Sequence, residues 1–176
     1  KDVGHKPGSL SFEQAAGLLL VGGTAWHLLT NTGVGTADTV LIHGAAGGVG
    51  LLAVQLAVAR GATVIGTASP ARHDQLRKYG ATPVAYGAGL ADRVRAIGPV
   101  DAALDLVGTD EALDTSVELV ADRSRIATIA GFGRAAELGG DGRAGEVPGD
   151  GAQAVRGPVR GDVLRARALD LRRPGP

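Results

Sequence analysis

A glycine-rich turn between an apolar run and a helical pattern constrains the fold of this chain more than any other feature. Residues 39–50 read TVLIHGAAGGVG. The apolar run 40–42 predicts a short strand that is buried on both faces. Apolar residues then recur at helical spacing through residues 51–60, and Gly61 stands where the glycine cap of a helix C-terminus is expected. The sequence therefore predicts a strand, a tight turn and a helix in immediate succession.

This turn predicts a phosphate cradle. Glycines allow backbone N–H groups to approach a pyrophosphate closely, and the N-terminus of the following helix adds a favourable dipole. In an alignment with the dinucleotide-binding fingerprint, the three key positions are Ala45, Gly47 and Gly50, so alanine replaces the first glycine. The alternative is an ordinary glycine-rich turn without a ligand. The candidate cradle consists of Ala45, Ala46, Gly47, Gly48, Val49 and Gly50.

The composition limits the class of protein. At 176 residues the chain has the size of one domain, with room for an appendage. Its formal net charge is zero and no basic stripe precedes residue 140, so a nucleic-acid partner is not expected. The absence of cysteine excludes disulfides and thiolate zinc sites within this sequence. Aromatic residues make up only 3% of the chain, which fits a nucleotide-binding unit better than a complete substrate pocket.

Neither a membrane span nor a secretion signal is predicted. The longest apolar run, residues 18–21, is far too short to cross a bilayer. The first six residues, KDVGHK, lack the features of a signal peptide. We therefore expect a cytoplasmic protein without a membrane partner.

Two short helices are predicted before the glycine turn. Ser11 and Gln14 form a capping box, in which each side chain can satisfy a backbone N–H group of the other residue. The first helix should run over about residues 12–20, and the pair Gly22-Gly23 should separate it from a second helix over residues 24–30.

After the turn, predicted strands alternate with predicted helices. Strands are expected at residues 63–67, 84–86, 100–107 and 125–130, and helices at residues 69–80, 89–97 and 109–120. Helices of about ten residues between strands indicate parallel βαβ units. The predicted fold class is therefore α/β, with a doubly wound parallel sheet.

The alternating pattern ends near residue 139. Residues 139–176 are dominated by Gly, Arg, Asp, Ala and Pro and contain no aromatic residue. A disordered tail, a marginal amphipathic helix over residues 163–171 and a slipped reading frame in GC-rich DNA each fit this composition. We favour disorder or frame slippage over a functional basic arm, which would be the one nucleic-acid or membrane candidate in the sequence.

Together these motifs resemble the cofactor-binding half of the medium-chain dehydrogenase/reductases, and within them the zinc-independent quinone oxidoreductase branch. The resemblance covers about residues 9–137 and rests on GTAW at 23–26, AAGGVG at 45–50, AVQLA at 53–57, GAT at 80–82 and DLVG at 105–108. Alanine at position 45 is common in that branch. The resemblance implies a Rossmann-like NAD(P)-binding domain over residues 37–138 that is incomplete at its C-terminal edge. Residues 1–36 would be lead-in helices from a preceding catalytic domain.

The end of the second predicted strand favours NADP(H) over NAD(H). NAD sites usually place an acidic residue there to bind the ribose hydroxyls, whereas residues 66–72 read GTASPAR. Ser69 stands at a helix N-terminus and Arg72 offers a planar cation, and both suit a phosphate. In the family that the chain resembles, equivalent residues and a tyrosine after the third strand, here Tyr86, hold the 2′-phosphate. The alternative is a capping serine beside a solvated arginine.

The resemblance also implies contacts elsewhere along the cofactor. The Thr24 region is similar to the segment that contacts the nicotinamide end. Further candidates follow predicted strands at the edge where such sheets bind ligands. They are Val107, Gly108, Gly131 and Phe132, and turn chemistry alone accounts for them about equally well.

Three polar residues are expected to have structural roles. His43 lies in the first predicted strand and is interpreted as a hydrogen-bonded core residue. Asp101 and Asp105 flank the fourth strand, where capping or charge roles are favoured over acid–base chemistry. The four histidines show no metal-ligand spacing, and no catalytic residue is named.

The resemblance implies hydride transfer from NADPH to a quinone or an α,β-unsaturated carbonyl, with the cofactor carrying the chemistry. The partner would be a small-molecule electron acceptor, no dedicated metal would be required, and the full-length family member could form a homodimer. Because a separate catalytic domain would form most of the substrate pocket, the chain is interpreted as a fragment with little activity alone. Two alternatives stay open. One is an enoyl reductase unit of a polyketide synthase, which the glycine turn and residues 67–70 also fit, and the other is a non-catalytic NADPH-binding module.

Overall fold

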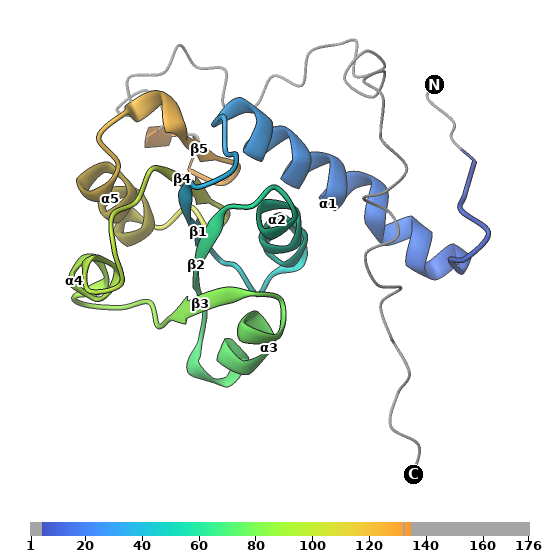
Figure 1. Cartoon of the computed structure of the whole chain (residues 1–176), viewed down its shortest axis with the longest axis horizontal. Helices are drawn as coiled ribbons and strands as arrows, with labels where there is room; N and C mark the ends of the chain where they lie inside the picture. The colour runs from blue at the N-terminus through green and yellow to red at the C-terminus, as the bar shows by residue number, and fades with distance from the viewer. Residues whose placement is uncertain (1–4, 132, 135–176) are drawn as a thin grey trace. The chain divides into compact units, whose positions relative to one another are not determined.

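The structure, a computed structural model, describes residues 5–131, 133 and 134 (Figure 1). Its elements are, in chain order, α1 (Phe12–Asn31), β1 (Thr39–His43), α2 (Gly48–Ala59), β2 (Thr63–Thr67), η1 (Pro70–Arg72), α3 (His73–Lys78), β3 (Ala81–Val84), α4 (Leu90–Arg95), β4 (Ala102–Asp105), α5 (Asp110–Leu119), η2 (Arg123–Arg125) and β5 (Ile126–Thr128). The predicted tail, residues 139–176, and Phe132 lie outside the described residues.

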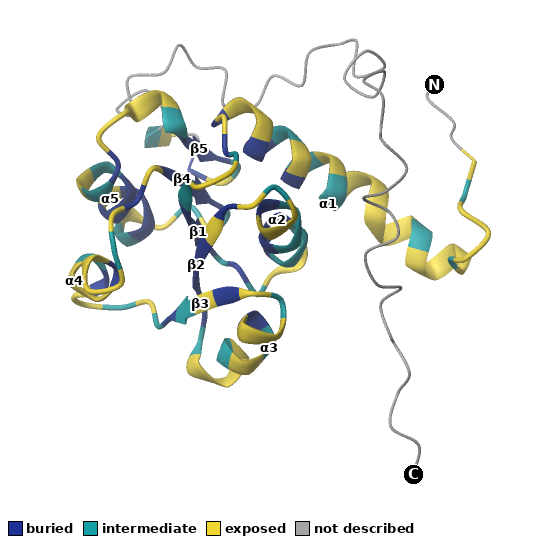
Figure 2. Cartoon of the chain, viewed as in Figure 1, coloured by how far each residue is buried: buried dark blue, intermediate teal, exposed yellow. Residues whose placement is uncertain are grey.

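The five strands form one parallel sheet with the order β3-β2-β1-β4-β5. This is the order of the first five strands of a Rossmann-like sheet, which confirms the predicted α/β fold class. The central strand β1 has apolar residues with no exposed surface, as its predicted burial on both faces requires. Figure 2 shows the buried residues gathered in the strands and on the helix faces turned toward them.

Helices cover both faces of this sheet. One buried cluster joins β1 to α1, α2 and α3 through Val40, Leu29, Val54 and Leu76. The other cluster joins the opposite face of the sheet to α4 and α5 and includes Leu41 of β1. Alternate residues of one strand thus enter different cores, as the period of two along a strand dictates. This layering holds the carboxyl ends of the strands in fixed positions.

The predicted break at Gly22-Gly23 is wrong, because α1 continues through it as one helix of 20 residues. Two glycines inside a helix cost about 1 kcal/mol each relative to alanine. Packing compensates, since Ala25, Leu28 and Leu29 are buried in the cluster shared with α2. The predicted capping box is confirmed, with the Ser11 and Gln14 side chains each accepting the other's backbone N–H. Among the described residues, no helix is long and apolar enough to cross a membrane.

The boundaries of the second strand are confirmed, whereas the third was predicted too late. β3 occupies Ala81–Val84, and its register pairs Thr67 of β2 with Val84. Because β2 ends at Thr67, residues 85 and 86 have no strand left to pair with. They enter a loop instead, and this loop carries Tyr86 to the edge of the sheet formed by the carboxyl ends of the strands. β4 and β5 are likewise shorter than their apolar runs.

Candidate functional site

The glycine turn after β1 is built by close backbone packing. Gly44 has φ +70°, and a Cβ there would lie 2.7 Å from Cγ1 of Val107. A Cβ at Gly50 would lie 2.3 Å from the Gly44 carbonyl oxygen, so only glycine lets α2 start this close to the strand. Within the turn, the positive φ therefore falls on Gly44 and not on Ala45. This explains how alanine is tolerated at the first fingerprint position.

The end of β2 fastens this turn from the side. The Ala45 N–H donates to the Thr67 carbonyl oxygen at 3.0 Å, and the Gly44 N–H donates to Oγ1 of Thr67 at 3.1 Å. The Ala45 side chain is fully buried, and a Cβ at Gly66 would lie 2.8 Å from its methyl group. The alanine thus fills space that Gly66 leaves empty.

The N-terminus of α2 opens from this turn toward solvent. Gly47 is the N-cap and has no side chain to satisfy the helix, and Gly47 and Gly48 are both exposed. Intrahelical bonding starts when the Leu51 N–H donates to the Gly47 carbonyl oxygen at 2.9 Å. The N–H groups at the start of α2 precede that bond and are oriented along the helix dipole, which is the arrangement that binds an anion.

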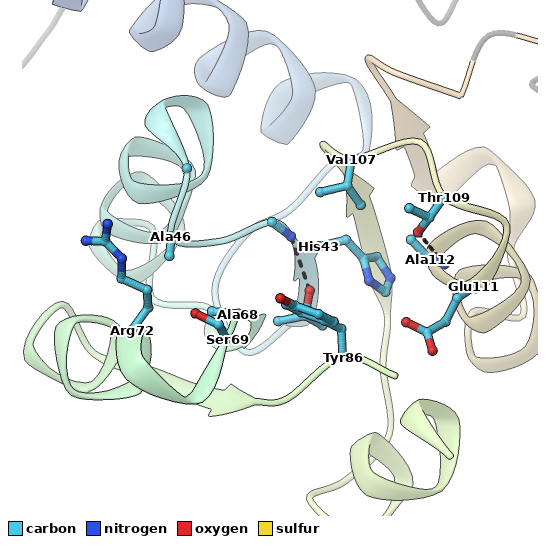
Figure 3. Close-up of a pocket in the computed structure, with 13 residues that line it drawn as sticks. His43, Ala46, Ala68, Ser69, Arg72, Tyr86, Val107, Thr109, Glu111 and Ala112 are labelled. Atoms are coloured by element: carbon cyan, nitrogen blue, oxygen red, sulfur yellow. Dashed lines mark hydrogen bonds between the residues drawn. The ribbon is translucent and has the colours of Figure 1, made fainter. Parts of the chain in front are cut away.

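A cavity of about 530 Å³ lies beside the turn at the carboxyl edge of the sheet (Figure 3). Its lining comes from the ends of β1, β2 and β4, from the loop after β3, and from the first turn of α5. Six of the predicted site residues line it, namely Ala46, Gly47, Ser69, Arg72, Tyr86 and Val107. The structure thus brings together residues that are up to 61 positions apart in the sequence, counting from Ala46 to Val107.

The polar side chains after β2 face this cavity without strong partners of their own. Ser69 is the N-cap of η1, yet its hydroxyl makes no capping hydrogen bond. The Arg72 guanidinium is exposed, and its contact with Oε1 of Gln75 is long, at 3.4 Å. No acidic residue occurs between β2 and Arg72. The end of β2 therefore offers a hydroxyl and a cation to a ligand, and no carboxylate.

The other predicted site residues in the described part of the chain do not line the cavity. Ala45, Gly48, Val49 and Gly50 form the turn and helix start behind it. The Thr24 hydroxyl donates to the Leu20 carbonyl oxygen within α1 at 2.8 Å. Gly108 has φ +71° and Gly131 is packed against Leu113, so both glycines are explained by the backbone geometry. Their predicted contacts with a cofactor stay predictions.

The two acids that flank β4 have the structural roles predicted for them. Asp105 is fully buried and accepts hydrogen bonds from the N–H groups of Val107 and Gly108 at 3.0 and 2.9 Å. It also accepts the Thr128 hydroxyl at 2.7 Å, which ties the β4 loop to β5. At the opposite end of the strand, Asp101 accepts the Thr39 N–H at 2.8 Å. Asp105 thereby fixes the loop that presents Val107 to the cavity.

His43 is a satisfied core residue, as predicted, although it also forms part of the cavity wall. It is 1% exposed, and its Nε2 lies 3.1 Å from Oγ of Ser116. Burial lowers the pKa of His43 to about 4, against the opposing charges of Asp105 and Glu111. The imidazole is therefore neutral at pH 7.

Sequence reasoning missed the lining contributed by the start of α5, namely Thr109, Glu111 and Ala112. The stretch 109–111 was interpreted only as a helix cap, and Thr109 does accept the Ala112 N–H at 3.3 Å. The order of the strands in the sheet is the signal that could have indicated these residues. Because β4 pairs with β1, the helix after β4 must begin next to the turn after β1.

No metal site is evident among residues 5–131 and 133–134. These residues contain no group of three or more His, Asp or Glu side chains that could hold a metal ion. The sequence also has no cysteine. The described side chains therefore do not fit a zinc centre, and we assign none of them a metal-binding role.

The sequence matches the family described as zinc-binding dehydrogenase over residues 48–141, which is more than half of the chain. The chain belongs to this family. Within the medium-chain dehydrogenase/reductase superfamily it is a quinone-oxidoreductase-like protein, and the match is to part of the domain. The predicted family is confirmed.

Similar solved structures support the same assignment. The quinone oxidoreductase from Coxiella burnetii is 41% identical with a TM-score of 0.65, over 76% of this chain and 42% of its own. The mycobacterial protein Rv1454c, solved as a complex with NADPH, is 36% identical with a TM-score of 0.65, over 71% and 40%. The CurK enoyl reductase is 33% identical with a TM-score of 0.64, over 71% and 39%.

One relative of this chain belongs to a polyketide synthase system. The spectinabilin polyketide synthase system protein NorB of Streptomyces orinoci is 38% identical over 128 residues, which are 70% of this chain and 6% of that protein. The chain spans less than half the length of each solved relative named above and a smaller share of this curated one.

Proposed function

We propose that this chain is the NADP(H)-binding part of an oxidoreductase that transfers hydride from NADPH to a quinone or an α,β-unsaturated carbonyl. One observation carries the cofactor assignment. Ser69 and Arg72 line the cavity at the end of β2, where an NAD site would present a carboxylate. The NADPH complex of the mycobacterial relative and the name of the Coxiella enzyme support the proposal.

Different residues of the cavity would bind different groups of such a cofactor. The N–H groups at the start of α2 would bind the pyrophosphate, in a turn that a Cβ at Gly44 or Gly50 would distort by collision with Val107 or with the Gly44 carbonyl oxygen. Ser69 and Arg72 would hold the 2′-phosphate, with Tyr86 beside them at the cavity wall. When bound, the nicotinamide supplies the hydride. The protein positions the cofactor and shields it from water.

The acceptor is proposed to be a small molecule, and the reaction to need no zinc. The described residues do not fit a metal centre, and the sequence lacks the thiolate ligands that many zinc sites use. We further propose that the remaining length of the Coxiella enzyme corresponds to the substrate-binding part, as this chain spans 42% of it. The 176-residue chain should then bind NADPH weakly and reduce quinones poorly. Robust steady-state quinone reduction by this chain alone would contradict that prediction.

A second candidate is an enoyl reductase unit of a polyketide synthase. The similarity to the CurK enoyl reductase and to NorB favours it. The two candidates share the cofactor half and differ in the acceptor. A protein that includes both this chain and its substrate-binding part would distinguish them by its relative rates with a quinone and with an enoyl thioester.

The cofactor assignment is tested by titrating NADPH and NADH into the chain and following the fluorescence of the reduced nicotinamide. Arg72→Ala should weaken NADPH binding by about tenfold, the value of one charge-assisted hydrogen bond, and should change NADH binding little. Arg77→Ala is the matched control, since Arg77 lies on α3, pairs with Asp74 at 2.6 Å and does not line the cavity. Equal affinity of the wild type for NADPH and NADH would contradict the assignment.

A further inference from the structure

The cavity carries a negative side chain at the side opposite its cationic one. Glu111, from the first turn of α5, is the one acidic residue among those that line the cavity in the described part of the chain. Figure 3 shows Arg72 and Glu111 on opposite sides, with Tyr86 between them and the Glu111 carboxylate directed toward Tyr86. A carboxylate repels a phosphate, so Glu111 would face a different part of a bound ligand.

Glu111 is held in place by the loop that carries Tyr86. The Gly87 N–H donates to Oε2 of Glu111 at 2.9 Å. The Arg93 guanidinium also fixes this loop, donating to the carbonyl oxygens of Ala85, Gly87 and Ala88 at 2.7–3.2 Å. A carboxylate has two oxygens and about four acceptor positions, so one N–H contact leaves most of its capacity free. Glu111 is thus an oriented acceptor.

The apolar lining of the cavity suits a flat ring. Val107 and Ala112 contribute to it from the β4 side, and Ala68 contributes from the end of β2. Tyr86 adds an aromatic ring to this lining (Figure 3). A planar base held among apolar side chains meets polar partners at its edge. Glu111 is the acidic acceptor among the residues that line this cavity.

We propose that Glu111 accepts a hydrogen bond from the 6-amino group of an adenine base, and so selects adenine cofactors over their 6-oxo analogues. Adenine presents an amino donor at that position. Hypoxanthine presents a carbonyl oxygen there instead, which a carboxylate repels. The inference rests on the proposed binding of NADP(H). It assigns to Glu111 the recognition of the adenine base, at the opposite end of the cofactor from the nicotinamide.

The test compares NADPH with its hypoxanthine analogue, deamino-NADPH, on the full 176-residue chain. The wild type should bind NADPH about tenfold more tightly, as expected for one hydrogen bond to a charged group. In Glu111→Gln the ratio should fall to about one or reverse, because the amide can donate to the 6-oxo group and its oxygen can still accept the Gly87 N–H. Unchanged thermal unfolding would show that the variant is folded.

Asp110→Asn is the matched control. It removes the same charge from the same turn of α5, but Asp110 pairs with Arg134 at 3.0 Å and does not line the cavity. The control should keep the wild-type ratio. Equal affinity of the wild type for the two cofactors, or the same change of ratio in both variants, overturns the inference alone. Failure of the wild type to bind either cofactor overturns the proposed function as well.

Discussion

The two edges of the sheet differ in the residues that form them: glycine turns at the carboxyl edge and an ion pair at the amino edge. At the carboxyl edge, the chain leaves β1 and β4 through Gly44 and Gly108, both with positive φ and both in contact with neighbouring loops. At the amino edge, an ion pair between two charged side chains connects the segments that precede β1 and β5. Asp38, just before β1, pairs at 2.8 Å with Arg125, just before β5.

This difference separates binding from stability. The carboxyl edge leaves backbone N–H groups and the side chains of Ser69 and Arg72 available to a ligand. At the amino edge, Asp38 and Arg125 satisfy each other and neighbouring backbone groups. Substitutions at the amino edge should therefore change only the free energy of unfolding, whereas those at the carboxyl edge should also change cofactor affinity.

The largest effect is expected from the acid at the carboxyl end of β4. Asp105→Ala would leave the N–H groups of Val107 and Gly108 and the Thr128 hydroxyl without their acceptor. At 1–3 kcal/mol for each unsatisfied buried group, we expect a loss of about 4 kcal/mol in the free energy of unfolding. Asp101→Ala, at the other end of the same strand, should cost only about 1 kcal/mol. Urea unfolding followed by circular dichroism measures both, and equal losses would remove the contrast.

The next effect tests the packing of α2 against the turn. Gly50→Ala should cost about 3 kcal/mol, because its Cβ meets backbone atoms that cannot move without shifting the helix. Cofactor affinity should fall with it. Gly48→Ala provides the control two residues earlier, where the nearest atom to a Cβ is Cγ1 of Val21 at 3.8 Å. Gly48→Ala should leave stability unchanged or raise it slightly. A stable Gly50→Ala chain would show that the close approach is not required.

The buried histidine predicts a dependence of stability on pH. The pKa of His43 is lowered to about 4, whereas the unfolded chain should titrate near 6.5. The unfolded state then binds more protons between these values, so stability is complete above pH 6.5 and falls as the pH drops from 6.5 to 4. The loss from this group should reach up to about 3 kcal/mol. His43→Gln, which does not titrate, should show a flatter profile in this window, and an unchanged profile would assign the loss to other groups.

The smallest effect is expected at the amino edge. The Arg125 guanidinium and the Gly35 N–H hold the pKa of Asp38 below its usual range, so its contribution is present at neutral pH and is lost as the pH falls through that lowered pKa. Asp38→Asn should cost about 1 kcal/mol at pH 7 and leave NADPH affinity unchanged. A clear loss of affinity in this variant would break the separation between the two edges.

Helices, strands and caps could be predicted from the sequence where a local residue pattern determines them. The strand at 63–67, the glycine that follows α2 and the Thr109 cap of α5 all appear where the sequence placed them. The continuity of α1 could not be predicted, because the buried contacts with α2 outweigh the cost of the pair Gly22-Gly23. The end of β3 depends on its register with β2, which no local pattern encodes.

The candidate site divides in the same way. Ser69 and Arg72 were found because the charge pattern after one strand is a local signal. Glu111 was missed because its place in the cavity depends on the neighbouring positions of β1 and β4 and on the loop at Gly87. Residues set by strand order become visible only once the sheet is assembled.

Binding of the cofactor at the carboxyl edge is tested by the backbone amide chemical shifts of the ¹⁵N-labelled chain, recorded during a titration with NADP⁺. We expect shift changes at residues 44–49, 68–72, 86–87 and 107–111, around the cavity at the carboxyl edge. We expect no change at residues 35–38 or at Arg125, at the amino edge. Changes centred on the amino edge, or none at a saturating concentration of NADP⁺, would contradict cofactor binding at the carboxyl edge.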